Sequence, residues 1–286
     1  MSAARVAVPR RARLAAVAMN PALVLVALVA VFAGPSLDVP WAPLLPLMGL
    51  LLVALFLAAT LLPRRLDVPA LLLDSPVQGP WEALNSPATK TPSHGTHGYG
   101  QTYAVDLVHT PADDPRPTFG QGRAMRPPTD YPAFDQPVHA VADGVVSRTS
   151  DRYRDHRSRS TWLAVAFMMI EGVVRELGGP GPVLGNHLVL RLADGSHVVY
   201  AHLRRGSLGV RAGQQVRAGQ VVARCGNSGN SSEPHLHVQR CDVARVSRAV
   251  GLPWAVRGGR PDGTDGLPAD GEVLDGRPAA PQDTGP

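Results

Sequence analysis

The segment EPHLHVQ at residues 233–239 places two histidines, His235 and His237, one residue apart in a run with strand character. Side chains at positions i and i+2 of a β-strand project from the same face, so both imidazole rings are expected to point the same way. Burial of two such rings requires a partner for each donor and acceptor that they carry. A single histidine of this kind is usually structural, whereas a pair on one face favours a functional site.

Further residues able to do chemistry lie upstream. Asp106 sits inside the apolar run YAVDLV, where a carboxylate is costly unless it is paired or bound to a metal. His94 and His97 occur just before it in SHGTHGYGQTYAVDL, and His202 occurs in VYAHL. A catalytic zinc site needs three ligands of the His, Asp or Glu type and one open position. One upstream histidine, Asp106 and one histidine of the HLH pair would supply the ligands, leaving the others for proton transfer.

The run from His94 to about Asp275 resembles the lysostaphin/LytM-type zinc metalloendopeptidases, which cleave peptide bonds in bacterial cell-wall peptidoglycan. The matching pieces are, in order, QTYAVDL, QPVHAVADGVV, GNHLVLRL, YAHL, VRAGQQVRAGQVVARCGNSGNSSEPHLHVQ, GLPWAV and LPADGEVL. The block GNSGNSSEPHLH is the most specific of them. The resemblance implies a peptide-bond hydrolase with Zn²⁺ as its cofactor, acting on peptidoglycan peptides or another peptide substrate.

The family pattern also implies roles for individual residues. Asp106 and His237 become metal ligands. His202 and His235 become the catalytic pair that deprotonates the attacking water and stabilises the tetrahedral intermediate. Zinc lowers the pKa of water towards about 7 and polarises the scissile carbonyl.

The remaining metal ligand is a histidine upstream of Asp106. In many members of the family it lies three residues before the aspartate, and no histidine does so here. Members with a QxYAxD run, which this chain resembles, place the ligand further upstream. This longer spacing favours His94 over His97.

Two other functions compete with a hydrolase. The RAGQQVRAGQVVA turn is similar to biotin or lipoate carrier folds, but these need a lysine at the hairpin tip, and the sole lysine, Lys90, lies far away. A catalytically inactive LytM-like module that binds and regulates other cell-wall hydrolases is the second alternative, and the unusual first ligand is its best support. A nucleic-acid partner is not expected, because the net charge of +5 comes without arginine clusters beside aromatic platforms.

Short β-like runs broken by Gly, Pro, Asp and Asn fill residues 94–275. They predict a mostly β fold, an antiparallel β-sheet or β-sandwich metallopeptidase domain with one inserted helix. That helix is expected over residues 160–177, with Gly178, Gly179 and Pro180 as its stop signal. We prefer a helix packed on the sheet, and the alternative is a helix that dips into the membrane surface. The loop 110–136 and the insertion 150–182 are expected to wall a substrate groove.

The N-terminal part is the most apolar. Leu14–Gly34 and Trp41–Leu62 carry no charge, and each is long enough for a membrane-spanning helix. They predict a basic segment (1–13), a two-helix transmembrane hairpin (14–65) that contacts lipid through residues 14–62, and a linker (66–93) before the β domain. The tail 276–286 is expected to be disordered.

These features predict a multi-pass protein of the cell membrane. Arginines flank both apolar segments, so the positive-inside rule places the β domain in the cytoplasm, whereas a wall hydrolase must face the wall. The side of the membrane and the oligomeric state stay open. Two cysteines, Cys225 and Cys241, permit a disulfide without requiring one.

Overall fold

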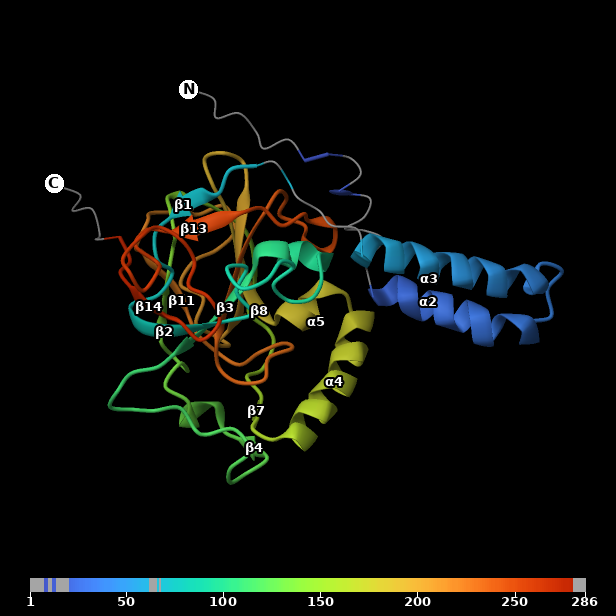
Figure 1. The fold of residues 1–286 in the computed structure, drawn as a ribbon, viewed down its shortest axis with the longest axis horizontal. Helices are drawn as coiled ribbons and strands as arrows, with labels where there is room; N and C mark the ends of the chain where they lie inside the picture. Colours follow the sequence, from blue (N-terminus) through green and yellow to red (C-terminus); the bar gives the residue numbers. More distant parts are fainter. Residues whose placement is uncertain (1–7, 10–11, 14–20, 62–65, 67, 280–286) are drawn as a thin grey trace.

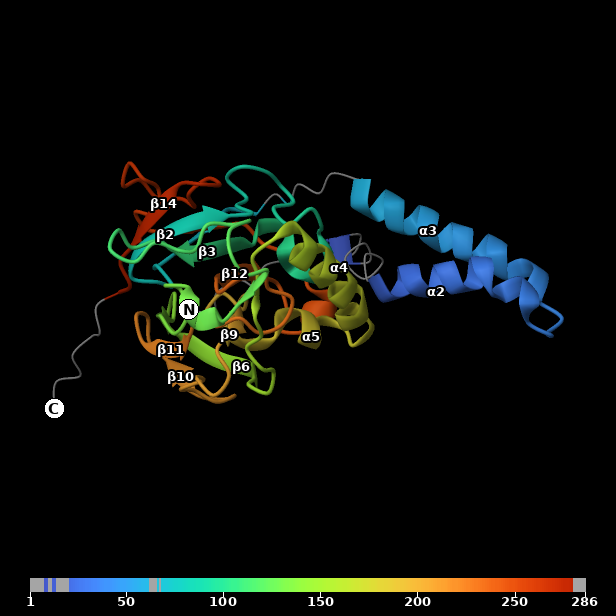
Figure 2. The same cartoon turned by 90° about the horizontal axis from the view of Figure 1, so that it is seen from below.

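The computed structural model describes residues 8–9, 12–13, 21–61, 66 and 68–279. Most of the predicted basic segment and tail, and the first residues of the predicted hairpin, lie outside this part of the chain. The described residues form a β domain from which two helices extend side by side, as Figures 1 and 2 show.

An eight-stranded sheet is the centre of the β domain, and every neighbouring pair of its strands is antiparallel. The strands, in spatial order, are β10 (Gln215–Val216), β6 (Gly144–Ser150), β8 (Asn186–Arg191), β9 (His197–Leu203), β12 (Leu236–Cys241), β3 (Val105–His109), β2 (Gly79–Leu84) and β14 (Val273–Gly276). The predicted mostly antiparallel β fold is therefore confirmed.

Three two-stranded sheets and several short 3₁₀ helices complete the domain. The paired strands are β1 (Leu71–Leu73) with β13 (Trp254–Val256), β5 (Pro137–His139) with β11 (Val221–Arg224), and β4 (Met125–Arg126) with β7 (Ser158–Arg159). The 3₁₀ helices are η1 (Gly34–Ser36), η2 (Ala42–Leu44), η3 (Gly98–Tyr103), η4 (Pro128–Asp130) and η5 (Val246–Arg248). The main apolar core lies between the large sheet and the strands β1, β5, β11 and β13.

The segment 66–93, predicted as a linker, is instead part of the fold. It contains β1 and β2, and β2 pairs with β3 on one side and with β14 on the other. Trp81 of β2 is fully buried in the main core. The prediction was wrong because the prolines and serines of this segment dominate its local pattern, while its strand structure depends on pairing with distant residues.

The described parts of the two predicted membrane spans form α2 (Pro21–Phe32) and α3 (Leu45–Leu61), which pack against each other. The second span is shorter than predicted, because η2, with Pro43 inside it, occupies the residues just before Leu45. No helix in the described part of the chain is long and apolar enough to cross a membrane. The predicted transmembrane hairpin is thus not confirmed.

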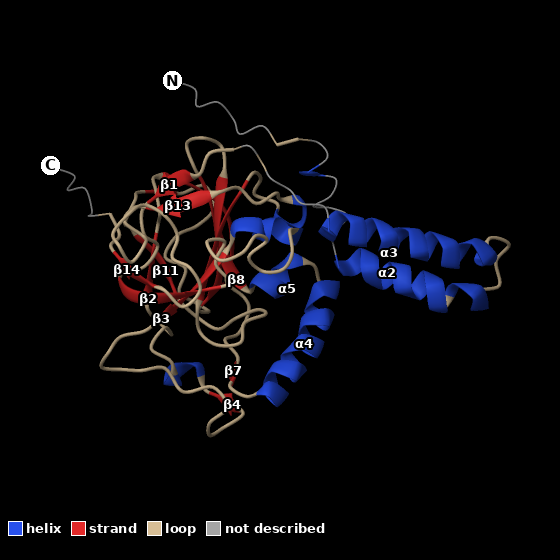
Figure 3. Ribbon diagram, viewed as in Figure 1, coloured by secondary structure: helices blue, strands red, loops and turns tan. Residues whose placement is uncertain are grey.

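The predicted helix over residues 160–177 is present as α4 (Trp162–Leu177), and a short α5 (Pro180–Leu184) follows it. Thr161 caps α4 by accepting a hydrogen bond from the backbone N–H of Ala164. Ala164 is the one residue of α4 that is buried. The preferred prediction of a helix packed on the sheet was therefore wrong, and Figure 3 shows α4 along one side of the β domain with one end near the hairpin.

Both cysteines are buried free thiols, so the disulfide that the sequence permits does not form. Burial raises the pKa of both thiols, that of Cys241 to about 12. Thiols with such raised pKa values are poor nucleophiles at neutral pH.

Candidate metal centre and active site

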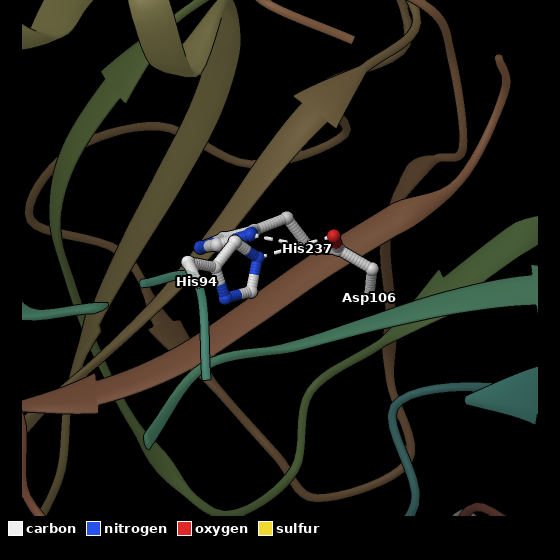
Figure 4. A group of neighbouring side chains, drawn as sticks. All are labelled: His94, Asp106 and His237. Atoms are coloured by element: carbon white, nitrogen blue, oxygen red, sulfur yellow. Dashed lines mark hydrogen bonds and ion pairs between the residues drawn. The ribbon is translucent and has the colours of Figure 1, made fainter. Parts of the chain in front are cut away.

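Strand pairing brings Asp106 and His237 together. In the register of β3 and β12 the two residues lie directly opposite each other, and Asp106 Oδ1 is 2.8 Å from His237 Nδ1. His94, from the loop between β2 and β3, places its Nε2 3.1 Å from the other carboxylate oxygen, Oδ2. The ligand atoms of the three residues all lie within 4.8 Å of one another. Figure 4 shows the three side chains converging from separate segments.

Hydrogen bonds set the tautomer of His94. The Ser93 hydroxyl donates to the carbonyl oxygen of Gln101 (3.1 Å), so the hydroxyl oxygen is left to accept from Nδ1–H of His94 (3.0 Å). The lone pair of neutral His94 is then on Nε2, the atom that faces Asp106. This ring presents a metal-binding nitrogen to the carboxylate.

The tautomer of His237 is set in a similar way by Gln239. The amide nitrogen of Gln239 donates to the carbonyl oxygen of Tyr99 (2.7 Å), which can only accept. The amide oxygen Oε1 therefore faces His237 and accepts from its Nε2–H (3.0 Å). In neutral His237 the lone pair lies on Nδ1, which points at Asp106. Such partners orient the histidine ligands of metal sites.

His202 and His235 lie against the same centre. Their rings are 4.7 Å apart between centroids, and His235 Nε2 is 3.6 Å from Asp106 Oδ1. His202 Nδ1–H donates to the carbonyl oxygen of Ser228, and His235 Nδ1–H donates to that of Glu233, both at 2.8 Å. Each ring is thus held through Nδ1, and its Nε2 is left for chemistry.

Local backbone geometry aims these two rings. In β9, a bulge shifts the pairing with β8 between Tyr200 and Leu203, and His202 within it has a φ of 60°. A positive φ is rare for a residue with a side chain and is found disproportionately at functional sites. His235 lies immediately before β12, so the predicted strand pair is a strand residue and its flanking residue. The rings of His235 and His237 nevertheless both lie beside Asp106.

The electrostatics of the cluster keep its groups in different protonation states. Burial alone would raise the pKa of Asp106, but His94, His235 and the hydrogen bond to His237 hold that pKa well below its usual range. Burial would lower the pKa of His237, yet the contact with Asp106 raises it. Burial, together with the neighbouring His235 and His237, lowers the pKa of His202 well below that of an ordinary histidine. Asp106 is therefore an anion and His202 a neutral base at pH 7.

The donor set fits a metal ion. Two imidazole nitrogens and one carboxylate with low pKa are the ligands of many catalytic zinc sites. His97 is not part of this group, and its Nδ1 contacts the hydroxyl of Thr102 (2.9 Å). The geometry thus agrees with His94 as the upstream ligand.

Two residues that help to build the centre were missed at the sequence level. Asn85 follows β2 and donates from Nδ2 to Asp106 Oδ2 (2.9 Å), but it lay in the presumed linker. Gln239 could have been found, since it lies two residues after His237 and so shares its face of the strand.

The edge of the centre carries charge from the long loop 110–136. Arg116 of this loop pairs with Glu233 (3.3 Å) and with Glu82 of β2 (3.6 Å). Glu233 is also the residue whose carbonyl holds His235. The loop therefore reaches the rim of the site, where it was expected to form a wall.

Residues 165–246 match the model of peptidase family M23. The matched residues include His202, His235 and His237, whereas His94 and Asp106 lie upstream of them. The chain is 38% identical over 71 residues to "Glycyl-glycine endopeptidase ALE-1" of Staphylococcus capitis, an alignment that covers 24% of this chain and 19% of that protein. It is 36% identical over 77 residues to an "Uncharacterized metalloprotease" of Haemophilus influenzae, covering 27% and 15%.

Among solved structures, the catalytic domain of lysostaphin from Staphylococcus simulans aligns with a TM-score of 0.30 and 20% sequence identity, over 52% of this chain and 74% of that one. The chain spans only 11% to 19% of the length of the curated relatives that it matches. The similarity to the curated relatives thus covers 69 to 77 residues of this chain.

Proposed function

We propose that the chain is a zinc-dependent endopeptidase that hydrolyses peptide bonds of bacterial cell-wall peptidoglycan, since residues 165–246 match the model of peptidase family M23. One observation carries the proposal: His94, His235 and His237 each have one ring nitrogen held by the protein and the other within 3.6 Å of the Asp106 carboxylate, and His202 packs against two of these rings. A metal ion bound between the carboxylate and these ring nitrogens would account for the arrangement.

In this proposal His94, Asp106 and His237 hold the zinc ion. When bound, zinc supplies Lewis acidity that polarises the scissile carbonyl and acidifies the attacking water. Asn85 and Gln239 keep the ligands oriented through their hydrogen bonds to Asp106 and His237.

His202 and His235 move the protons. The lowered pKa of His202 keeps its ring neutral, so that Nε2 can accept a proton from the attacking water. Once protonated, either ring can donate from Nε2 to the oxyanion or to the leaving amine, because Nδ1–H is already engaged with a backbone carbonyl. The backbone contacts of Ser228 and Glu233 prevent the rings from turning away.

A membrane location is also part of the proposal. The side chains of α2 and α3 are apolar and many are exposed to solvent, among them Phe32 (77%), Leu51 (69%) and Leu47 (67%). Contact with lipid would remove this surface from water. A peptidoglycan substrate requires the β domain to lie on the wall side of the membrane. A reporter enzyme fused after Pro286 and active only in the cytoplasm would contradict that substrate.

The test compares two neighbouring histidines in the full chain, purified in detergent. We expect near-stoichiometric zinc in the wild type and in His97→Ala, and loss of zinc in His94→Ala and His237→Ala, by elemental analysis. The same samples are then incubated with purified peptidoglycan, and new amino termini are counted. A folded wild type that takes up no zinc refutes the proposal. Zinc without cleavage of any peptide bond would favour the regulatory module instead.

A further inference from the structure

Helix α4 turns its apolar side chains outward. Leu163, Trp162 and Ile170 are 81%, 77% and 67% exposed. The other large exposed apolar residues of the helix are Phe167, Met169, Val173, Val174 and Leu177. Together these eight residues form what we name the outer face of α4. An apolar face of this size on a helix in water is unfavourable unless something covers it.

The charged residues of α4 point the other way, into the β domain. Glu171 pairs with Arg159, which is 5% exposed, and also with Arg175 (3.6 Å). Glu176 accepts a hydrogen bond from the hydroxyl of Tyr99 (2.5 Å). A surface helix of a soluble protein buries its apolar stripe and exposes its charges. The arrangement in α4 is the reverse, and this suits a helix whose outer side faces an apolar phase.

The outer face is continuous with the helical hairpin. A cavity of about 450 Å³ between α4 and the hairpin is lined mainly by apolar side chains, including Val24, Leu28, Phe56, Met169 and Val173. At the other end of α4, Phe119 packs edge-on against Trp162, with ring centroids 5.0 Å apart. The apolar surface thus runs from the hairpin along α4 to the tip of the loop 110–136.

The orientation of the helices agrees with one flat apolar phase. Figure 1 shows the hairpin extending away from the β domain. Helix α4 lies on the side of the domain from which the hairpin projects and runs crosswise to it. Met169, Val173 and Leu177 of the outer face line the cavity against the hairpin, while Glu171 and Glu176 face the domain. A hairpin that enters a bilayer would therefore bring α4 down along the bilayer surface.

The hairpin itself favours lipid over a protein partner. The exposed residues at positions 25, 26, 28 and 29 of α2, and at 47, 48, 50 and 51 of α3, cover about half of each helix at 100° per residue. The remaining halves face each other, so the pair shows apolar side chains outward from both helices. A protein partner covers one side of such a pair, whereas lipid surrounds it.

We propose that the outer face of α4 lies in the interfacial layer of a lipid bilayer and holds the catalytic domain in one orientation on the membrane. This inference rests on the proposed membrane location, and it adds a second contact besides the hairpin. Interfacial helices of this kind bury their apolar face about 5–10 Å into the boundary between headgroups and acyl chains.

Tryptophan fluorescence tests the contact in the full chain. Trp81 and Trp254 are buried, so in a Trp41→Phe variant Trp162 is the exposed tryptophan. The variant is reconstituted into vesicles of phosphatidylcholine and phosphatidylglycerol with brominated acyl chains, which quench only tryptophans in contact with them. We expect quenching relative to unbrominated vesicles, and its loss in Trp41→Phe/Trp162→Phe. Flotation with the vesicles should be equal for both.

A matched pair of charge substitutions gives a second readout. Ile170→Glu/Val174→Glu in the Trp41→Phe background should abolish quenching of Trp162, whereas Val221→Glu/Val273→Glu, at exposed valines of the β strands, should not. Both should keep wild-type zinc content. Unquenched Trp162 in a chain that floats with vesicles overturns the inference, as does α4 cross-linked to a second copy without quenching. If the wild-type chain does not float with the vesicles, the inference about α4 is overturned. Zinc uptake and peptide cleavage would still test the proposed enzyme independently.

Discussion

His237 and Gln239 share one face of β12 and are joined by a hydrogen bond of 3.0 Å from the ring Nε2–H to the amide oxygen. The same amide donates to the carbonyl of Tyr99, so it can hold only one orientation. The ring of His237 therefore turns its other nitrogen to Asp106. Gln239 thus orients one of the three residues that we propose as metal ligands.

Gln239→Ala should weaken zinc binding about 10- to 100-fold, the usual cost of removing a partner that orients a ligand. The zinc affinity of Gln239→Glu should lie between those of the wild type and Gln239→Ala, because this variant keeps an acceptor for His237 and loses the donor to Tyr99. Competition with a chromogenic chelator measures the affinity, with Gln215→Ala, at the exposed residue of β10, as the control. Unchanged affinity in Gln239→Ala would show that the hydrogen bond has no role in binding.

His202→Ala and His235→Ala should separate metal binding from turnover. Both variants keep the three metal ligands, so we expect zinc content near that of the wild type. Each loses a proton-transfer group, which should lower kcat about 10²- to 10⁴-fold. Cleavage of peptidoglycan and elemental analysis of the same samples provide the two readouts, with His109→Ala as a histidine control outside the cluster. Full activity in either variant would exclude that ring from the chemistry.

Zinc affinity should fall as the pH is lowered. Asp106 raises the pKa of His237, so the ring of the metal-free protein holds its proton to higher pH than an ordinary histidine. Zinc needs the lone pair that this proton occupies, and binding near neutral pH should release a proton. We expect the affinity to rise steadily between about pH 5.5 and about pH 8, around the usual histidine pKa. Calorimetry in buffers of different ionisation enthalpy measures the released proton, and its absence would contradict the assignment.

The same shift has a consequence for the metal-free fold. A raised pKa means that protonated His237 stabilises the folded state at low pH, and this contribution is lost as the pH rises through the folded-state pKa. The lowered pKa of Asp106 acts oppositely: its contribution is present above the unfolded pKa of about 3.9 and is lost as the pH falls towards the folded value. The Asp106–His237 pair should therefore contribute most to the stability of the metal-free protein between these two transitions, as a double-mutant cycle measured by urea unfolding at a series of pH values would show.

Trp81→Ala tests whether β2 belongs to the catalytic domain. Trp81 is fully buried, and its truncation should lower the free energy of unfolding by about 3–5 kcal/mol. Trp162→Ala removes a side chain that is 77% exposed and should change it by less than about 0.5 kcal/mol. Urea unfolding of both variants in detergent gives the comparison. Equal free energies of unfolding for the two variants would show that residues 79–84 are not part of the folded domain.

Much of the candidate site could be predicted from short patterns. The HLH pair, Asp106 in its apolar run and His202 stand out because strand alternation and the cost of burying a charge act locally. The resemblance to family members with a QxYAxD run favoured His94, and the structure brings that residue, not His97, to the carboxylate. Asn85 was missed because β2, the strand that it follows, exists only through pairing with β3 and β14.

The sequence alone therefore determined the residue types of the centre, the antiparallel β character of the domain and the presence of a helix near residues 160–177. These follow from periodicity and from the chemistry of single side chains. Only the tertiary structure decided which histidine meets Asp106, which amide orients His237, and that α4 carries its charges inward. Periodicity identifies a helix with two unlike faces, but which face meets the protein depends on residues far away in the chain, here Arg159 and Tyr99.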